Sequence, residues 1–187
     1  MKNTTISMIA ATLALAGFLA CGGGGDKKPV PATKLEYTDP TGTGYRFVKA
    51  ASSTATKLVL ELRGPATETG RGVSFSVTSD PTKAAFVKVD QGDPEYAQNA
   101  AFDLGSTEPK LFKGVLDGNS LKVSVAQKGN TITAKPLDNA LVRIAMEMKQ
   151  GIAQNTTISF AASDARELPA SGGSRPITIA VGAVTAK

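Results

Sequence analysis

The chain has no histidine, no tryptophan and one cysteine in 187 residues. Without an imidazole, serine–histidine–acid and cysteine–histidine mechanisms are closed, and so are the usual zinc sites, because these chemistries depend on histidine. One cysteine allows no internal disulfide. Sixteen acids would be enough for a glycosidase, but no motif pairs them. We therefore expect no enzyme, no catalytic residues, no cofactor and no metal.

Strong clusters of positive charge are also missing. The chain carries 21 basic and 16 acidic side chains, for a formal net charge of +5, and its longest basic run is Lys27-Lys28. Because no basic stripe is present, we expect no nucleic-acid partner. A weak attraction to anionic lipid or polysaccharide near a membrane stays open.

Aromatic residues make up 5% of the chain, and the amphipathic rings are Tyr37, Tyr45 and Tyr96. We expect Tyr45 in the core and Tyr96 against a helical turn, so a flat strip of rings for stacking sugars is not expected. Met146 and Met148 fall in the apolar phase of a strand and are expected in the core.

Alternation with period two is the main pattern present. Val73, Phe75 and Val77 alternate with Ser74 and Ser76, as in a strand with one buried face. Similar segments lie around residues 45–47, 58–62, 85–89, 111–115, 121–125, 132, 142–148, 158–160 and 177–181. Nine or ten strands predict an all-β fold, an antiparallel β-sandwich over residues 35–187.

One short helix is the most that this pattern allows. Asp93 is expected as its N-cap and Pro94 as its first residue, with the turn continuing to residue 101. The same loop offers an alternative, because Asp90, Asp93 and Glu95 carry the oxygen ligands that Ca²⁺ prefers.

The first 20 residues predict a signal peptide that is removed. Lys2 is followed by a charge-free apolar run from Ile6 to Ala20, which is too short to cross a bilayer comfortably. The segment Gly17-Phe18-Leu19-Ala20-Cys21 resembles the lipobox of bacterial lipoproteins, although Phe18 and Leu19 depart from it. The resemblance implies cleavage before Cys21 and lipid attachment there, and Gly22 implies the outer membrane. An ordinary signal peptide cut near Ala20, leaving a free thiol, is the alternative.

Residues 21–34 are expected to form a flexible linker behind the lipidated cysteine. Four glycines follow Cys21, and Pro29 and Pro31 come later. A phosphate-binding loop is the other meaning of such a glycine run, but no strand precedes it and no Gly-Lys-Ser/Thr follows. The segment therefore predicts a tether between membrane and domain.

From about Lys57 to the end, the chain resembles the cohesin family of jelly-roll β-sandwiches. The resemblance rests on shared order: Val73–Val77 running into Asp80-Pro81, then Phe86–Val89, Leu121–Val125, Leu141–Met148 and Thr156–Phe160, and a closing strand from Ile177 to Val184 with Gly182. Gly182 is expected where the backbone bulges or meets another segment closely. The resemblance implies a non-catalytic module that binds a protein partner, either dockerin-like or another envelope protein.

Taken together, the sequence predicts an exported lipoprotein, lipid-anchored in the bacterial outer membrane, that presents a β-sandwich to a protein partner. Two alternatives to a protein-binding module remain at this point. One is a module that binds a glycan or extracellular polymer, as relatives of the fold do, and the other is a purely structural envelope lipoprotein.

Overall fold

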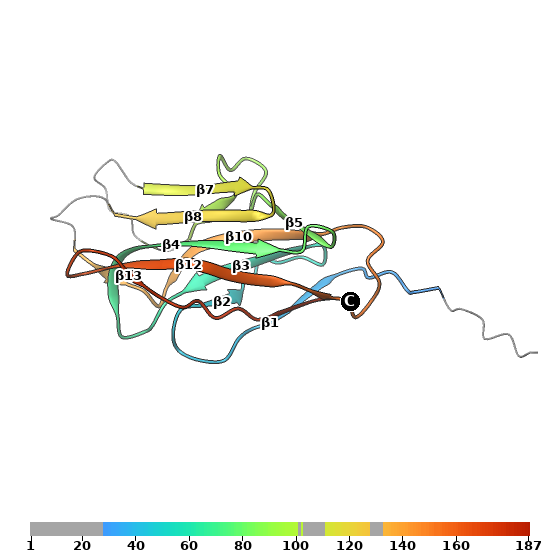
Figure 1. Ribbon diagram of the computed structural model, residues 1–187, viewed down its shortest axis with the longest axis horizontal. Coiled ribbons are helices and arrows are strands. Elements are labelled where there is room, and N and C mark those ends of the chain that lie inside the picture. The colour runs from blue at the N-terminus through green and yellow to red at the C-terminus, as the bar shows by residue number, and fades with distance from the viewer. Residues whose placement is uncertain (1–27, 101, 103–110, 128–132) are drawn as a thin grey trace, which may run out of the picture.

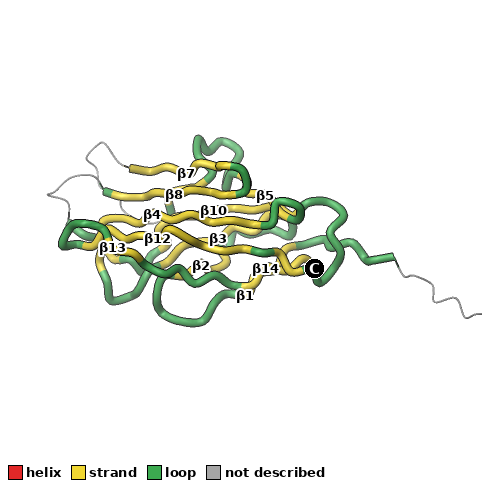
Figure 2. The backbone as a smooth tube through the Cα atoms, in the orientation of Figure 1, coloured by secondary structure: helices red, strands yellow, loops and turns green. Residues whose placement is uncertain are grey.

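The computed structural model describes residues 28–100, 102, 111–127 and 133–187. These residues form strands and loops without a helix, as Figure 2 shows. The strand segments are β1 (Leu35–Thr38), β2 (Arg46–Lys49), β3 (Lys57–Arg63), β4 (Thr69–Ser79), β5 (Ala84–Val87), β6 (Ala97–Asn99), β7 (Leu111–Asp117), β8 (Ser120–Ala126), β9 (Lys135–Pro136), β10 (Ala140–Met148), β11 (Thr157–Ile158), β12 (Phe160–Pro169), β13 (Arg175–Pro176) and β14 (Ala183–Ala186).

Two antiparallel sheets make up most of the fold (Figure 1). One has the order β2-β3-β10-β5, with β6 also paired to β10. The other has the order β13-β12-β4-β8-β7, with β9 paired to β4. The predicted all-β, antiparallel sandwich is confirmed, although it contains fourteen segments in the described residues rather than nine or ten. The number is higher because β9, β11 and β13 are only two residues long, and because the alternation did not predict β1 or β6.

The core lies between these two sheets. Leu58, Leu60 and Leu62 of β3 are fully buried on one side, and the predicted alternation in β4 buries Val73, Phe75 and Val77 on the other. Phe47 of β2 joins the two layers. Its ring lies 5.5 Å from that of Phe75 and 5.7 Å from that of Phe160, centroid to centroid, in edge-to-face contacts.

A small third sheet, of order β1-β14-β11, closes the end where the chain enters the domain. Here the close backbone approach predicted at Gly182 is confirmed. A Cβ on Gly182 would stand 1.9 Å from the Thr38 carbonyl oxygen, a distance that no side chain can occupy. The Gly182 N–H donates to the Tyr37 hydroxyl at 2.7 Å, and burial raises the pKa of this tyrosine to about 12.

The predicted helical turn at Asp93–Ala101 is wrong over its described residues. Asp93 does not cap a helix: its Oδ2 accepts a hydrogen bond from the Asp90 N–H at 2.9 Å. Residues 97–99 form β6 instead, with Ala97 opposite Ile144 of β10. Pairing with a central strand thus outweighs the local capping pattern, because it satisfies the backbone over several residues.

The predicted strand at Ile177–Val181 is also wrong, because this segment crosses from one sheet to the other. Ala180 makes an isolated parallel bridge to Arg46, and regular pairing resumes only at Ala183. The predicted strand at Ile132 lies outside the described residues. Tyr45 and Met146 are buried as expected, whereas Met148 and Tyr96 are partly buried at the margin of the core.

Candidate functional site

The two sheets differ in how their outer faces are covered. On the β3–β10 sheet, loop residues Ala50 and Val89 are buried at 3% and 4% exposure against Val59 and Ala145. This second small apolar cluster, joined by Val87, covers part of that outer face. Two neighbouring loops therefore already occupy this side of the sandwich.

An arginine–glutamate ladder, made of hydrogen-bonded side chains of β3 and β10, lies on the same face. Arg143 of β10 donates from Nε and Nη2 to Oε1 of Glu61, at 3.0 and 2.9 Å. Arg63 donates to the other oxygen at 2.9 Å. Burial opposes ionisation of Glu61, but the hydrogen bonds from both arginines outweigh it and lower its pKa. One carboxylate thus fixes both guanidinium groups against this face of the sheet, with one positive charge in excess.

The outer face of the other sheet is an open grid of short side chains, which we name the hydroxyl face. Pairing places the outward residues of β12, β4, β8 and β7 in three rows, four strands across. Six of the twelve positions are serine or threonine, and none is aromatic. The rows, in that strand order, are Arg166-Ser74-Ser124-Lys113, Ser163-Ser76-Lys122-Val115 and Ala161-Thr78-Ser120-Asp117.

Two exposed apolar side chains mark one margin of this face. Val115 is 52% exposed and Leu111 is 45% exposed, and both point outward from β7. Single exposed apolar residues need no explanation. A pair on one strand, beside a grid of small polar residues, offers an apolar contact on one side of the hydroxyl face.

The free edge of β7 is blocked at its centre. The Tyr96 N–H donates to the Gly114 carbonyl at 2.9 Å, and the Gly114 N–H donates to Oε2 of Glu95 at 3.1 Å. Lys113 pairs with Oε1 of Glu95 at 3.0 Å, and these interactions lower the pKa of the Glu95 carboxyl. Addition of a foreign strand along this edge is hindered, so the face is the available surface.

The three acids considered as calcium ligands are not brought together. The Gln98 amide donates to Oδ2 of Asp90 at 2.8 Å and lies beside Asp93, whereas Glu95 turns away to Lys113 and Gly114. Within the part of the chain that the structure describes, no three carboxylate, histidine or cysteine residues gather as a metal site. The alternative of a Ca²⁺ loop is therefore not supported at these residues.

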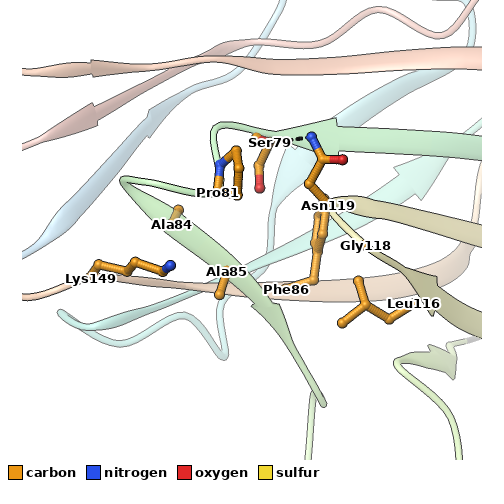
Figure 3. Close-up of a pocket in the computed structure, with 9 residues that line it drawn as sticks. All are labelled: Ser79, Pro81, Ala84, Ala85, Phe86, Leu116, Gly118, Asn119 and Lys149. Atoms are coloured by element: carbon orange, nitrogen blue, oxygen red, sulfur yellow. Dashed lines mark hydrogen bonds between the residues drawn. The ribbon is translucent and has the colours of Figure 1, made fainter.

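A cavity of about 170 Å³ opens between the sheets at the end where the β4–β5 turn meets the β7–β8 hairpin (Figure 3). Phe86 and Leu116 contribute its apolar surface, and Lys149 stands at its side. At one edge of the cavity the Asn119 amide donates to the Ser79 carbonyl at 3.5 Å. This volume is close to that of cavities that hold one benzene ring.

The turn beside this cavity is fixed by Asp80. Its Oδ1 accepts hydrogen bonds from the Thr82 hydroxyl at 2.6 Å and the Thr82 N–H at 2.9 Å, and Lys83 lies 3.0 Å from Oδ2. Hydrogen bonds from Thr82 and Lys83 lower the pKa of the Asp80 carboxyl to about 2. The turn therefore keeps its charge pattern across the physiological range.

The lipidation site predicted at Cys21 lies outside the described residues, and so do the predicted signal peptide and the glycine run. No segment of residues 28–100, 102, 111–127 and 133–187 is a helix long and apolar enough to cross a membrane. Sequence reasoning did not find the hydroxyl face. The serines that alternate with Val73, Phe75 and Val77 were visible in the sequence as outward-facing residues. Which of the two outer faces is open depends on the loop cover, and the sequence does not show that.

Similar solved structures define the architecture. The second type II cohesin module of the ScaA scaffoldin from Acetivibrio cellulolyticus matches with a TM-score of 0.56 and 12% identity, over 83% of this chain and 98% of that one. The sixth cohesin of scaffoldin B from the same organism, in complex with a Cel5 dockerin mutant, matches with a TM-score of 0.52 and 14% identity, over 79% and 100%. A type II cohesin from Bacteroides cellulosolvens gives 0.52 and 10%, over 76% and 98%.

The chain thus has a cohesin-like β-sandwich fold. No protein-family model and no curated protein matches it. At these identities the likeness extends to the fold, and the predicted cohesin-like jelly-roll sandwich is confirmed at that level.

Proposed function

We propose that this chain is an exported lipoprotein, attached through Cys21 to the bacterial outer membrane, whose sandwich is a non-catalytic module that binds a protein partner. The hydroxyl face carries the proposal. It is a broad, open sheet surface with short side chains, whereas loops and an arginine–glutamate ladder occupy the opposite face. A protein surface can approach such a face closely because no long side chain stands in its centre except Lys122.

The composition of the face favours a protein over a glycan. Tyr37 and Tyr45 are buried, and the twelve grid positions hold no ring on which a sugar could stack. Arg166, Lys113 and Asp117 stand at three corners of the grid, with Val115 on one side. These charges can pair with complementary charges on a protein surface, which would fix the orientation of the partner.

One of the similar cohesins was solved with a dockerin bound, which supports a folded protein as the partner class. A dockerin-like module or another envelope protein would meet the hydroxyl face as a surface, not as an added strand, because Glu95 and Tyr96 block the β7 edge. Tethering at a membrane would raise the effective concentration of a weak contact.

The experiment compares two arginine substitutions as bait in envelope extracts from the producing organism. Ser76→Arg places a long charge in the central row of the hydroxyl face, and Ala85→Arg places the same group on the exposed side of β5 in the other sheet. We expect Ser76→Arg to weaken partner capture by about thirtyfold, as at a central interface position, and Ala85→Arg to leave it unchanged.

Both variants must keep the wild-type unfolding temperature for this comparison. Equal capture by Ser76→Arg and the wild type would contradict a role for the hydroxyl face. Failure of the wild-type chain to retain any specific partner, even under gentle conditions, would contradict the binding function itself.

A further inference from the structure

The N-terminal segment joins one particular end of the sandwich, which we name the tether end. The Val30 carbonyl accepts from the Gln154 N–H at 2.8 Å, and the Ala32 N–H donates to the Ile152 carbonyl at 2.7 Å. Residues 30–34, in the predicted linker, are therefore fastened beside the loop that follows β10. The β4–β5 turn and the C-terminal residue Lys187 lie at the same end (Figure 1).

The tether end carries more lysines than acidic residues. Lys28 lies just before the fastened segment, and Lys149 follows β10, where its N–H donates to the Lys83 carbonyl at 2.8 Å. Neither Lys28 nor Lys149 has an ion-pair partner within the described residues, and both are exposed. Lys187 donates to the Asn155 amide oxygen at 2.8 Å rather than to a carboxylate.

The acids at this end are each beside a lysine. Lys34 pairs with Glu36 at 2.5 Å, Lys83 with Asp80 at 3.0 Å and Lys122 with Asp117 at 2.7 Å. Two further acids lie here. Glu147 stands opposite Lys57, whose ammonium donates to the Val89 carbonyl, and Asp39 accepts from the Lys49 backbone N–H. Lys57 and Lys49 equal these two acids in number, so Lys28 and Lys149 leave the tether end with an excess of positive charge.

The position of the predicted anchor brings this charge to a membrane. Cys21 precedes Lys28 by seven residues, which span at most about 25 Å when fully extended. Val30, which is 61% exposed, adds an apolar side chain at the same end. Asp26 and Lys27, which precede Lys28 in the sequence, cancel each other in formal charge and leave that of Lys28.

We propose that the tether end docks on a lipid surface that carries anionic headgroups, with Lys28 and Lys149 as its main contacts. Each lysine close to such a surface adds to the attraction, and the short tether keeps both within reach. The strands run lengthwise away from the tether end in Figure 1. Docking therefore stands the sandwich upright and leaves the hydroxyl face pointing sideways, open to a partner. This inference rests on the membrane attachment included in the proposed function.

The test uses the full chain, expressed with its N-terminal segment, purified from membranes and reconstituted into vesicles of phosphatidylcholine alone or with phosphatidylglycerol. Exposed amines are labelled with a membrane-impermeant acetylating reagent and quantified residue by residue. Lys113, on the hydroxyl face, is the internal reference. We expect the labelling of Lys149 relative to Lys113 to fall about tenfold in phosphatidylglycerol vesicles, and to recover at high salt.

A matched pair of charge reversals completes the design. Lys149→Glu is expected to restore labelling of Lys28 in phosphatidylglycerol vesicles, whereas Lys113→Glu is expected to leave its protection intact. If Lys149 is labelled equally in both lipids while the chain still co-floats with the vesicles, the docking is contradicted and the lipid anchor is not. A chain that floats with neither vesicle would contradict the anchor and the docking together.

Discussion

Replacing Phe47 with alanine is expected to lower the free energy of unfolding by about 4 kcal/mol, the value typical of truncating a buried phenylalanine. Phe47 is fully buried and its ring meets Phe75 and Phe160 from the opposite sheet. The substitution removes both edge-to-face contacts and leaves a cavity between the layers. For a domain of this size, we expect the melting temperature to fall by about 12 °C.

Thermal and urea unfolding, followed by circular dichroism, measure this change. Phe47→Leu serves as the matched control, and we expect it to cost about 1–2 kcal/mol because it keeps most of the apolar volume. Val115→Ala, on an exposed position, should change stability by less than about 0.5 kcal/mol. A loss below about 1 kcal/mol for Phe47→Ala would mean that Phe47 does not join the two sheets.

Replacing Arg175 with alanine is expected to cost about 3 kcal/mol, although its side chain is half exposed. Arg175 donates from Nε and Nη2 to Oε2 of Glu167, at 3.2 and 3.0 Å, and Glu167 is fully buried on the inward side of β12. Loss of the guanidinium would leave a buried carboxylate without its counter-charge. Removing one partner of a buried ion pair destabilises a fold more than replacing both partners. Tyr45 lies near the same carboxylate, and burial together with Glu167 raises its pKa.

Two other variants separate charge from packing at this position. Glu68→Gln removes the exposed second partner of Arg175 and is expected to cost under 1 kcal/mol. Glu167→Met combined with Arg175→Met replaces the pair with apolar groups and should recover most of the stability lost in Arg175→Ala. The free energy of unfolding from urea titrations measures all three. If the double variant is less stable than Arg175→Ala, the unpaired charge is not the cause of the loss.

Strand alternation was predictable wherever one face of a strand is buried by the other sheet. Val73, Phe75 and Val77 were placed correctly because a period of two needs no long-range information. The bend at Asp80-Pro81 and the close approach at Gly182 were also predictable, since each residue type has a specific backbone use.

Features that depend on partners far along the chain were missed. The turn at Asp93 has the local pattern of a helix start, but β6 pairs with β10, more than 40 residues away. Glu167 gave no signal in the sequence, because a buried acid is tolerated only through Arg175 and this pair is visible only in the fold.

The choice between the two outer faces could not be predicted for the same reason. Both sheets have strands whose outward-facing residues include polar ones. The two outer faces differ because the loop residues Ala50 and Val89 pack onto Val59 and Ala145 and cover one of them. The hydroxyl residues of β4 become a candidate site only when this loop cover leaves their side of the sandwich open.

Site-specific crosslinking tests the central claim most directly. A photo-reactive amino acid is placed in the full chain at Val115, on the margin of the hydroxyl face, or at Ala85, on the exposed side of β5. Cells of the producing organism are irradiated, and crosslinked proteins are identified by mass spectrometry. A discrete crosslinked protein from Val115 and none from Ala85 is the predicted result. The same protein crosslinked from Ala85 and absent from Val115 would contradict the account.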